Sequence, residues 1–349
     1  GENLPDTNLD TESKTISLEQ KIFSGFKGVN TFKKSELETQ KAKLELKKAE
    51  QQTILDTASA YFDLIYKSKN EKFNISNVNL FERQVESDNV RLQKGEITLT
   101  DLAQSESSLA GAKASLIKAK TELLSSKTNF TRVTREQPPS FEDLSERFNL
   151  VLPSSLSSSL NLSKLNNLEL LVTKLDYEIS IKNLKIERAR LSPSASITVS
   201  KSENKDFSSS IDEKDDETVK ATISWPIIKG GENASAIKKS SLEKQRAQLI
   251  LKDTSNKVSI DTTNSWSKYQ SLKSVLEATK AQLKAAEIAN EGITLEYDSS
   301  NTRSTLEVIQ STSILLDARI SHAKAERDFF ISQFELVKQI GTLSLDSVK

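Results

Sequence analysis

Residues 102–123, LAQSESSLAGAKASLIKAKTEL, decide the fold of this chain. They carry leucine at every seventh position and a small residue three positions after each of the first three leucines. A seven-residue spacing of this kind is typical of helices that pack along one another. The same two series return 206 residues later in 308–329, as Val308, Leu315, His322 and Phe329 and as Ser311, Ala318 and Ala325. Agreement between two interleaved series indicates an internal repeat.

The repeat reaches well beyond these two stretches. A shift of 205 residues aligns QKIFSG at 20–25 with WPIIKG at 225–230. No glycine or proline occurs between Gly28 and Gly95 in the first half, or between Gly231 and Gly292 in the second. Because helices tolerate neither residue well in their interiors, these spans predict helices of about 100 Å. Each half therefore predicts a long helix, a break and a second long helix that returns beside the first.

The apolar stripe on these helices is narrow. Ile54, Ala58, Tyr61 and Ile65 follow the spacing of a helix seam, while charged residues crowd the rest of the surface. Charged residues make up 28% of the chain and aromatic residues only 6%, a composition that favours long hydrated helices over a compact mixed core. Such helices suit the wall of a tube that has water inside and outside.

Three shorter segments predict strands. Residues 15–19, 194–200 and 219–225 alternate apolar residues with Ser, Thr, Lys or Glu. The polar stretch 202–218, which contains the acidic run 212–217, predicts an exposed loop at the tip of a hairpin. Alternation over about ten residues is the weak signature of a membrane barrel. Taken alone, the strands fit an ordinary half-buried sheet about as well.

Composition argues against several functions. The 49 basic and 49 acidic residues cancel, unlike the basic surplus expected of a nucleic-acid-binding protein. The chain has no cysteine and shows no phosphate-binding loop, metal-spaced cluster or nucleophile elbow, so we expect neither enzyme activity nor a cofactor. The single histidine, His322, aligns with Leu116 of a helix seam and predicts a packing role. The chain contains no run of about 18 apolar residues, so we expect no transmembrane helix.

The repeat also sets the expected organisation of the chain. We expect a first repeat at 1–137, a proline- and serine-rich connector at 138–165 and a second repeat at 166–345. The expected elements are a strand at about 14–24, a helical hairpin at 29–137, a helix at 166–191, strands at about 193–201 and 217–228, and a helical hairpin at 232–340. Because the second repeat opens with a helix and a strand, we expect the same two elements to precede residue 1. The absence of methionine likewise predicts a processed or truncated chain.

Several stretches resemble motifs of the TolC family of outer-membrane efflux and type I secretion proteins. QKIFSG at 20–25 and WPIIKGG at 225–231 resemble its strand-to-helix element, and TASAYFDL at 57–64 resembles its A-x-A-Y-x-x-L helix motif. KGEITLTDL at 94–102 resembles the turn that reverses its helices, and GTL at 341–343 resembles the close of its last helix. The order and spacing of these motifs extend the resemblance over nearly the entire chain from residue 15 onward.

The resemblance implies a fold, an assembly and a location. The fold would be mainly α with a small β part, in which long antiparallel coiled-coil hairpins form an α-barrel and the strands contribute to a trimeric transmembrane β-barrel. The protein would be a homotrimer in contact with lipid of a Gram-negative outer membrane, with its helical part in the periplasm. It would act as a passive, gated exit duct together with a periplasmic adaptor protein and an inner-membrane transporter. No nucleic acid is expected as a partner.

The resemblance also implies a gate at the periplasmic tip. By motif, polar links between the hairpins fall on Thr100, Asp101, Tyr297 and Arg303, and a ring of acidic side chains falls on Glu307. Arg303 and Glu307 are four residues apart, so a local ion pair on one helix is an alternative. Gln310 stands where a second aspartate is usual, which would leave three carboxylates in the ring. Adaptor docking would use the two turns, at Lys94, Gly95, Glu96, Ser300 and Asn301.

Two other functions fit parts of the sequence. A periplasmic adaptor also contains a long helical hairpin, but it would show one hairpin between small β domains, whereas this chain predicts two. A coiled-coil scaffold or adhesin would have no use for the alternating strands or for the junction at 226–231. In TolC-like systems the choice of cargo belongs largely to the inner-membrane partner.

Overall fold

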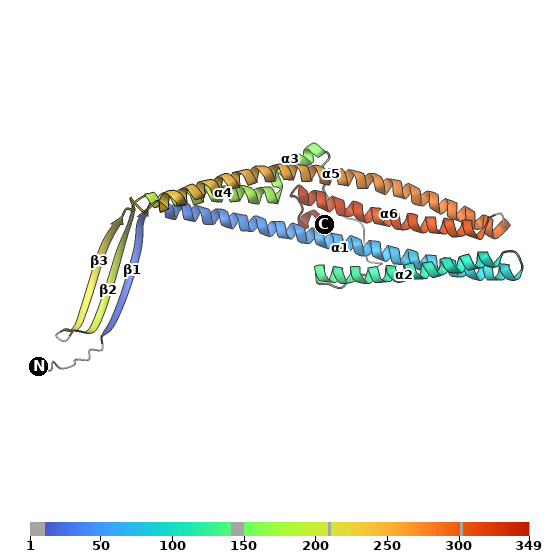
Figure 1. The fold of residues 1–349 in the computed structure, drawn as a ribbon, viewed down its shortest axis with the longest axis horizontal. Coiled ribbons are helices and arrows are strands. Elements are labelled where there is room, and N and C mark those ends of the chain that lie inside the picture. The colour runs from blue at the N-terminus through green and yellow to red at the C-terminus, as the bar shows by residue number, and fades with distance from the viewer. Residues whose placement is uncertain (1–10, 141–149, 209–210, 301–302, 349) are drawn as a thin grey trace. The chain divides into compact units, whose positions relative to one another are not determined.

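The computed structural model describes residues 11–140, 150–208, 211–300 and 303–348. In chain order its elements are β1 (Glu12–Ser24), α1 (Lys27–Gln93), α2 (Leu99–Thr134), α3 (Leu156–Asn166), α4 (Leu168–Arg188), η2 (Ala189–Leu191), β2 (Ser194–Ser208), β3 (Ile211–Ser224), α5 (Glu232–Ser300), α6 (Thr305–Gln339) and η3 (Leu345–Val348) (Figure 1). The chain forms two compact units, which we call the sheet unit (1–44 and 171–254) and the helical unit (45–170 and 255–349). Because α1 and α5 begin in the sheet unit and end in the helical unit, these units cut across the two sequence repeats.

The predicted long helices are present. The helix α1 has 67 residues and α5 has 69, and neither contains proline. The returning helices α2 and α6 have 36 and 35 residues. In the helical unit α2 lies beside α1, and α6 lies beside α5 (Figure 1). Among the described helices, none combines the length and the apolar composition needed to cross a membrane.

The helical unit has its core in narrow seams between neighbouring helices. One apolar cluster joins α1 to α2, and a second joins α1 to α6. The first contains Ala60, Leu64, Leu123 and Phe130, and the second contains Phe62, Ile65, Phe334, Val337 and Leu343. The small residues of the seven-residue series are buried in both returning helices, at Ser105, Ala112 and Ala119 and at Ser311, Ala318 and Ala325. Small side chains let helix backbones approach closely, so these positions set the spacing of the helices.

The connector expected at 138–165 contains most of a helix that the sequence analysis did not predict, α3. Within the expected connector at 138–165, Ser155 caps α3 through its side-chain hydroxyl. The end of α3 packs against Gly341, where a Cβ atom would lie 2.1 Å from the Asn166 carbonyl oxygen. Gly341 also has a φ of +81°, so only glycine fits this contact. The helix expected at 166–191 corresponds to α4 followed by the short turn η2.

The sheet unit contains an antiparallel sheet with the order β1-β2-β3. Its register sets Leu18 opposite Val199, and Val199 opposite Val219. Since successive residues of a strand point to opposite faces, these alternating apolar residues share one face of the sheet. The adjacent row on the other face is polar and consists of Ser17, Ser200 and Thr218.

The strands β2 and β3 are longer than the sequence predicted. We expected strands at about 193–201 and 217–228 with a polar loop at 202–218, but β2 and β3 extend through most of that loop. The prediction was wrong because it required alternating apolar residues. Residues 202–206 and 212–218 are all polar, and the register sets opposite charges across the strands at Lys201 with Glu217 and at Lys205 with Glu213, although Glu203 stands opposite Asp215. Such cross-strand pairs stabilise a sheet without an apolar face.

The end of β3 also differs from the expectation. The strand stops at Ser224, short of the expected residue 228. Pro226 follows and has no backbone N–H with which to continue the pairing. Trp225 donates its indole N–H to the Leu191 carbonyl oxygen at 3.1 Å, so it contacts the segment after α4.

Candidate functional site

The turn between α1 and α2 is built around a glycine. Gly95 has a φ of +73°, and the N–H of Glu96 donates to the Arg91 carbonyl oxygen at 2.9 Å. A left-handed glycine followed by such a backward hydrogen bond is a common way to end a helix. Lys94, Gly95 and Glu96 are all exposed at this turn.

Both returning helices begin with the same kind of cap. Thr98 caps α2 and Ser304 caps α6, and in each case a carboxylate three residues later completes a capping box. Asp101 accepts from the Thr98 N–H at 2.9 Å, and Glu307 accepts from the Ser304 N–H at 2.8 Å. These reciprocal bonds satisfy backbone donors that the helix itself leaves unpaired. The two caps occupy equivalent positions under the shift of 206 residues.

The caps also control the ionisation of these carboxyl groups. Hydrogen bonds from the Thr98 backbone N–H and then from its hydroxyl lower the pKa of Asp101. The Ser304 backbone N–H, followed by the Arg303 guanidinium, lowers the pKa of Glu307. Arg303 donates to Glu296 at 2.6 Å and to Glu307 at 2.9 Å, and these bonds raise the pKa of Arg303. Both capping carboxyl groups are therefore ionised at neutral pH.

A buried polar cluster ties the two hairpins together near the turns. Tyr297 of α5 donates its hydroxyl to Asp88 of α1 at 2.7 Å, and Thr305 of α6 lies 3.1 Å from that hydroxyl. Ser105 of α2 donates to the other carboxylate oxygen of Asp88 at 2.5 Å. Gln84 of α1 donates to Asp88 at 2.9 Å and to the Tyr297 hydroxyl at 3.2 Å. These five residues, which we call the tip cluster, come from all four long helices.

Four of the five members of the tip cluster are buried, and Gln84 is half-buried at its edge. Asp88 is 0% exposed and Tyr297 is 2% exposed. Burial is the main cause that raises the pKa of the Tyr297 phenol, so Tyr297 remains a neutral donor. The Arg91 guanidinium lies 4.3 Å from the centre of the Tyr297 ring, where a cation is attracted to the ring face. A buried carboxylate is tolerated when its oxygens accept hydrogen bonds, and each donor left unpaired by its loss costs about 1–3 kcal/mol.

The structure brings together part of the predicted gate. Tyr297 does link the hairpins, but its acceptor is Asp88, while Asp101 is engaged in the cap of its own helix. The reason is geometric, since the capping box holds the Asp101 carboxylate against Thr98. Arg303 forms an ion pair with Glu307, four residues away. This is the local contact that the sequence allowed as the alternative to a link between the hairpins.

Of the remaining predicted residues, some are exposed at the surface and others fall outside the residues that the structure describes. Thr100 is exposed in the first turn of α2, and Gln310 is exposed near the start of α6. Asn301 and the side chain of Ser300 fall outside the described residues. The roles of all these residues in gating and docking stay predictions.

Sequence reasoning missed the acceptor at the centre of the tip cluster. Asp88 lies seven residues after Phe81 and fourteen after Asn74, and all three are buried on α1. A carboxylate at a seam position is itself a signal, because charges are rarely buried in a helix seam without a partner. The partner lies more than two hundred residues away, so no local pattern could name Tyr297.

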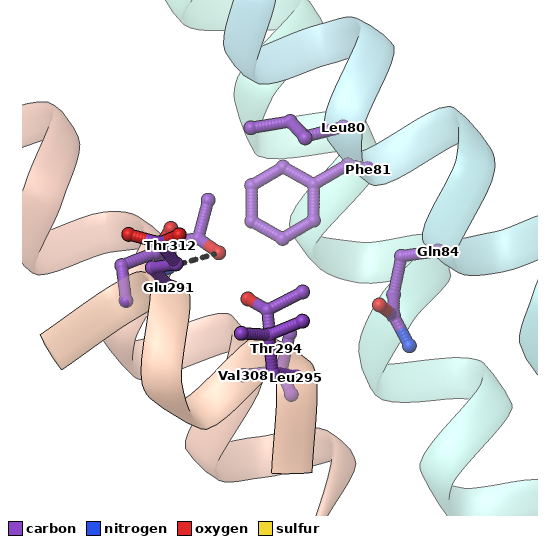
Figure 2. A pocket seen from close by; sticks show the side chains of 9 residues that line it. Leu80, Phe81, Gln84, Glu291, Thr294, Leu295, Val308 and Thr312 are labelled. Atoms are coloured by element: carbon purple, nitrogen blue, oxygen red, sulfur yellow. Dashed lines mark hydrogen bonds between the residues drawn. The ribbon is translucent and has the colours of Figure 1, made fainter. Parts of the chain in front are cut away.

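Beside the tip cluster the hairpins leave a groove of about 260 Å³. Figure 2 shows Leu80, Phe81 and Gln84 of α1 on one side, with Thr294 of α5 and Val308 of α6 on the other. Gln84 belongs both to this groove and to the tip cluster. The hairpins therefore meet here through polar contacts and through a buried apolar cluster in which Val78, Phe81 and Ala112 pack with Ile309 of α6. The groove leaves this seam incompletely filled.

Comparison with known proteins gives consistent matches over most of the chain. A family model described as outer membrane efflux protein matches residues 2–134 and 160–342. Outer membrane efflux protein BepC of Brucella suis is 25% identical over 335 residues, which cover 95% of this chain and 73% of BepC. Outer membrane protein TolC of Escherichia coli is 22% identical, over 97% of this chain and 71% of TolC. The crystal structure of the outer membrane protein VceC from Vibrio cholerae matches with a TM-score of 0.80 at 17% identity, over 97% of this chain and 82% of VceC.

Proposed function

The chain belongs to the outer membrane efflux protein family, and from this membership we propose that it is one subunit of an outer-membrane exit channel. The channel lets cargo of a tripartite efflux or type I secretion system pass across the periplasm and the outer membrane without chemical change. The observation that carries this proposal is the family match over both halves of the chain. The family is one of channels and not of enzymes.

The two other functions considered from the sequence fit less well. A periplasmic adaptor would provide one helical hairpin, whereas the family match takes in the regions 2–134 and 160–342, with a hairpin in each. A fibrous scaffold or adhesin would not need a sheet with one apolar and one polar face.

The proposed channel is a homotrimer. In the described part of the chain, the sheet ends in β1 on one side and β3 on the other, and each outer edge carries backbone groups that need partners. Neighbouring copies supply these partners, and exposed apolar residues such as Leu18 and Ile223 face outer-membrane lipid. The helical part lies in the periplasm, where an adaptor protein and an inner-membrane transporter complete the system.

The tip cluster holds the proposed channel closed at its periplasmic end. It joins the α1/α2 hairpin to the α5/α6 hairpin, so the hairpins cannot part at the tip while Tyr297 is bonded to Asp88. Thr100, Asp101 and Arg303 contribute to the same gate through contacts between copies. A typical protein hydrogen bond contributes about 1 kcal/mol, which a bound partner can supply. Docking of a transporter complex at the turns would then open the gate by separating the hairpins.

Glu307 forms the acidic constriction of the proposed channel. Three copies supply three carboxylates at this level, and Gln310, three residues further along α6, adds no charge. The electrostatic barrier to anions and the capture of divalent cations are therefore weaker than in a ring that has both carboxylates in every copy.

Recordings in planar lipid bilayers test this function. The full chain is expected to produce discrete conductance steps that are small, because the tip is closed. The Asp88→Ala variant should produce steps that are several-fold larger. No steps from protein that sediments as a trimer would exclude a channel. Unchanged steps in Asp88→Ala would exclude the tip cluster as the gate and leave the channel assignment standing.

A further inference from the structure

Arg91 connects the turn between α1 and α2 to the tip cluster. Its Nε–H donates to the Glu96 carboxylate at 3.3 Å, and its guanidinium lies 4.3 Å from the centre of the Tyr297 ring. Arg91 lies in the last turn of α1, Glu96 lies in the turn that follows, and Tyr297 belongs to α5. One side chain therefore contacts both the exposed turn of the first hairpin and a buried ring of the second.

The Glu96 carboxylate is positioned by the backbone of this turn. The Glu96 N–H donates to the Arg91 carbonyl oxygen, and the Gly95 N–H donates to the Leu92 carbonyl oxygen, both at 2.9 Å. Glu96 is therefore tied to Arg91 through its backbone as well as through its side chain. A displacement of the turn that breaks these backbone bonds would also move the carboxylate away from the guanidinium.

Arg91 is more protected from water than Glu96. The Arg91 side chain is 14% exposed and that of Glu96 is 38% exposed. A cation is attracted to an aromatic ring face more strongly where water is scarce, so burial strengthens the contact of Arg91 with Tyr297. The contact with Glu96 is an ion pair open to solvent, and such a pair contributes little to stability. The Glu96 contact is therefore the one that a binding event can change at low cost.

Arg91 and Asp88 hold two different parts of Tyr297. They are three residues apart on α1, so they share one face of that helix. Asp88 accepts from the Tyr297 hydroxyl at 2.7 Å, and Arg91 lies over the ring. Because a tyrosine side chain is rigid, a ring that is free to tilt also moves its hydroxyl. Arg91 therefore helps to keep the hydroxyl where Asp88 can accept from it.

We propose that Arg91 is a positioning residue through which the turn between α1 and α2 controls the tip cluster. While the turn is undisturbed, Glu96 holds the guanidinium over the Tyr297 ring. A docked partner that displaces the turn draws Glu96 away, the guanidinium leaves the ring, and the bond from Tyr297 to Asp88 weakens. The inference rests on the proposed gate, and it adds the route by which docking at the first turn reaches that gate.

Single-channel recordings of the full chain in planar bilayers test this route. The readout is the fraction of time that the channel spends at the large conductance of Asp88→Ala. Arg91→Ala should raise this open fraction about fivefold, as expected from the loss of a partly buried contact between a cation and a ring. Glu96→Gln should raise it only about twofold, because the guanidinium keeps some contact with the ring. Arg91→Lys should restore part of the closure, since an ammonium group is also attracted to a ring face.

Two control variants match these changes in charge. Arg83→Ala and Glu86→Gln each remove a charge from an exposed position of the same helix, away from the Tyr297 ring. Both should leave the open fraction unchanged. Sedimentation and circular dichroism of every variant verify that the trimer and its helices are intact.

Double-variant cycles separate this route from a merely structural role. Arg91→Ala/Glu96→Gln should match Arg91→Ala alone, because Glu96 acts only through Arg91. In a Tyr297→Leu background, which has no ring, Arg91→Ala should have no further effect. In a Tyr297→Phe background, which keeps the ring, Arg91→Ala should raise the open fraction again. Additive effects of Arg91→Ala and Glu96→Gln, or a full effect of Arg91→Ala without the ring, would overturn the role of Arg91.

The recording of Asp88→Ala distinguishes this failure from a failure of the gate. Larger steps in Asp88→Ala, together with additive effects of the Arg91 and Glu96 variants, would overturn the role of Arg91 and leave the gate standing. Unchanged steps in Asp88→Ala would exclude the gate, and this inference with it.

Discussion

The two helical hairpins share a starting design and differ where they meet. Both returning helices begin with a capping box, at Thr98 in the first hairpin and at Ser304 in the second. The first hairpin ends its long helix with Gly95 in the left-handed conformation, whereas no glycine stands between Tyr297 and Ser304 in the second. The first turn is therefore stabilised by its own backbone, while in the described part of the second turn Arg303 forms ion pairs with Glu296 of α5 and Glu307 of α6.

The central contact of the tip cluster has no equivalent within either repeat. Under the shift of 205 residues Tyr297 aligns with Leu92, and Asp88 aligns with Ile293. Tyr297 and Asp88 therefore each align with an apolar residue in the other sequence repeat. The hydrogen bond between them forms once in the chain and joins the two repeats. The internal repeat gives the chain its two hairpins, and the sequence differences between the two repeats give the specific link that joins them.

The largest effect is expected when the shared acceptor is removed. Asp88→Ala leaves the Ser105 and Tyr297 hydroxyls buried without their acceptor, at about 1–3 kcal/mol for each donor. The free energy of unfolding, measured by urea titration of the helical circular dichroism signal, should fall accordingly. Asp298→Ala removes an exposed carboxylate from the end of α5 and should change little. Similar losses in both variants would argue against a special role for Asp88.

A smaller effect is expected when only the tyrosine hydroxyl is removed. Tyr297→Phe keeps the buried ring and its contact with Arg91 but loses the bond to Asp88, so stability should fall by about 1 kcal/mol. Channel conductance should rise in the same variant. Tyr269→Phe is the matched control, because Tyr269 lies on the same helix and forms only ring contacts in the described structure. If the control weakens the protein as much, the hydroxyl bond is not what joins the hairpins.

A third comparison asks which hairpin lines the constriction. Gln310 aligns with Gln104 under the shift of 206 residues, and both are exposed near the start of a returning helix. Gln310→Asp should add carboxylates beside Glu307 and lower the concentration of divalent cation that blocks the channel by about tenfold. Gln104→Asp should leave the block unchanged. If both variants lower the blocking concentration of divalent cation, residues of both hairpins line the constriction.

The smallest effect is expected from the two equivalent caps. The pKa values of Asp101 and Glu307 are lowered from their ordinary values of 3.8 and 4.5. Each carboxylate therefore stabilises the folded chain fully above its ordinary pKa and progressively less as the pH falls through the lowered value. Asp101→Asn and Glu307→Gln should each flatten the acid limb of a stability profile measured against pH. Profiles that run parallel to that of the unmodified chain would contradict the assigned caps.

Much of the fold could be predicted because its signals are local. The absence of glycine and proline between Gly28 and Gly95 predicted the length of α1, and the leucine spacing from Leu102 predicted α2. The extension of β2 and β3 was missed because polar pairs such as Lys205 and Glu213 form only after the strands are in register. The helix α3 was missed because its serine-rich sequence also fits a loop.

In the candidate site, too, contacts between residues close in sequence could be predicted and contacts between distant residues could not. Arg303 and Glu307 are close in sequence, so their ion pair could be anticipated from spacing alone. Asp101 has a capping partner only three residues away, and its local bonds decide where its carboxylate lies. Tyr297 was assigned to a link between the hairpins, but its acceptor could not be named from either turn.

The sequence by itself determined the four long helices, their turns and their caps, because these depend on residues within a few positions of one another. Only the tertiary structure decided that Tyr297 of α5 meets Asp88 of α1 and that Phe62 of α1 packs against Phe334 of α6. Those contacts join residues that are far apart along the chain. Their positions depend on how whole helices and strands align, and no short stretch of sequence specifies that alignment.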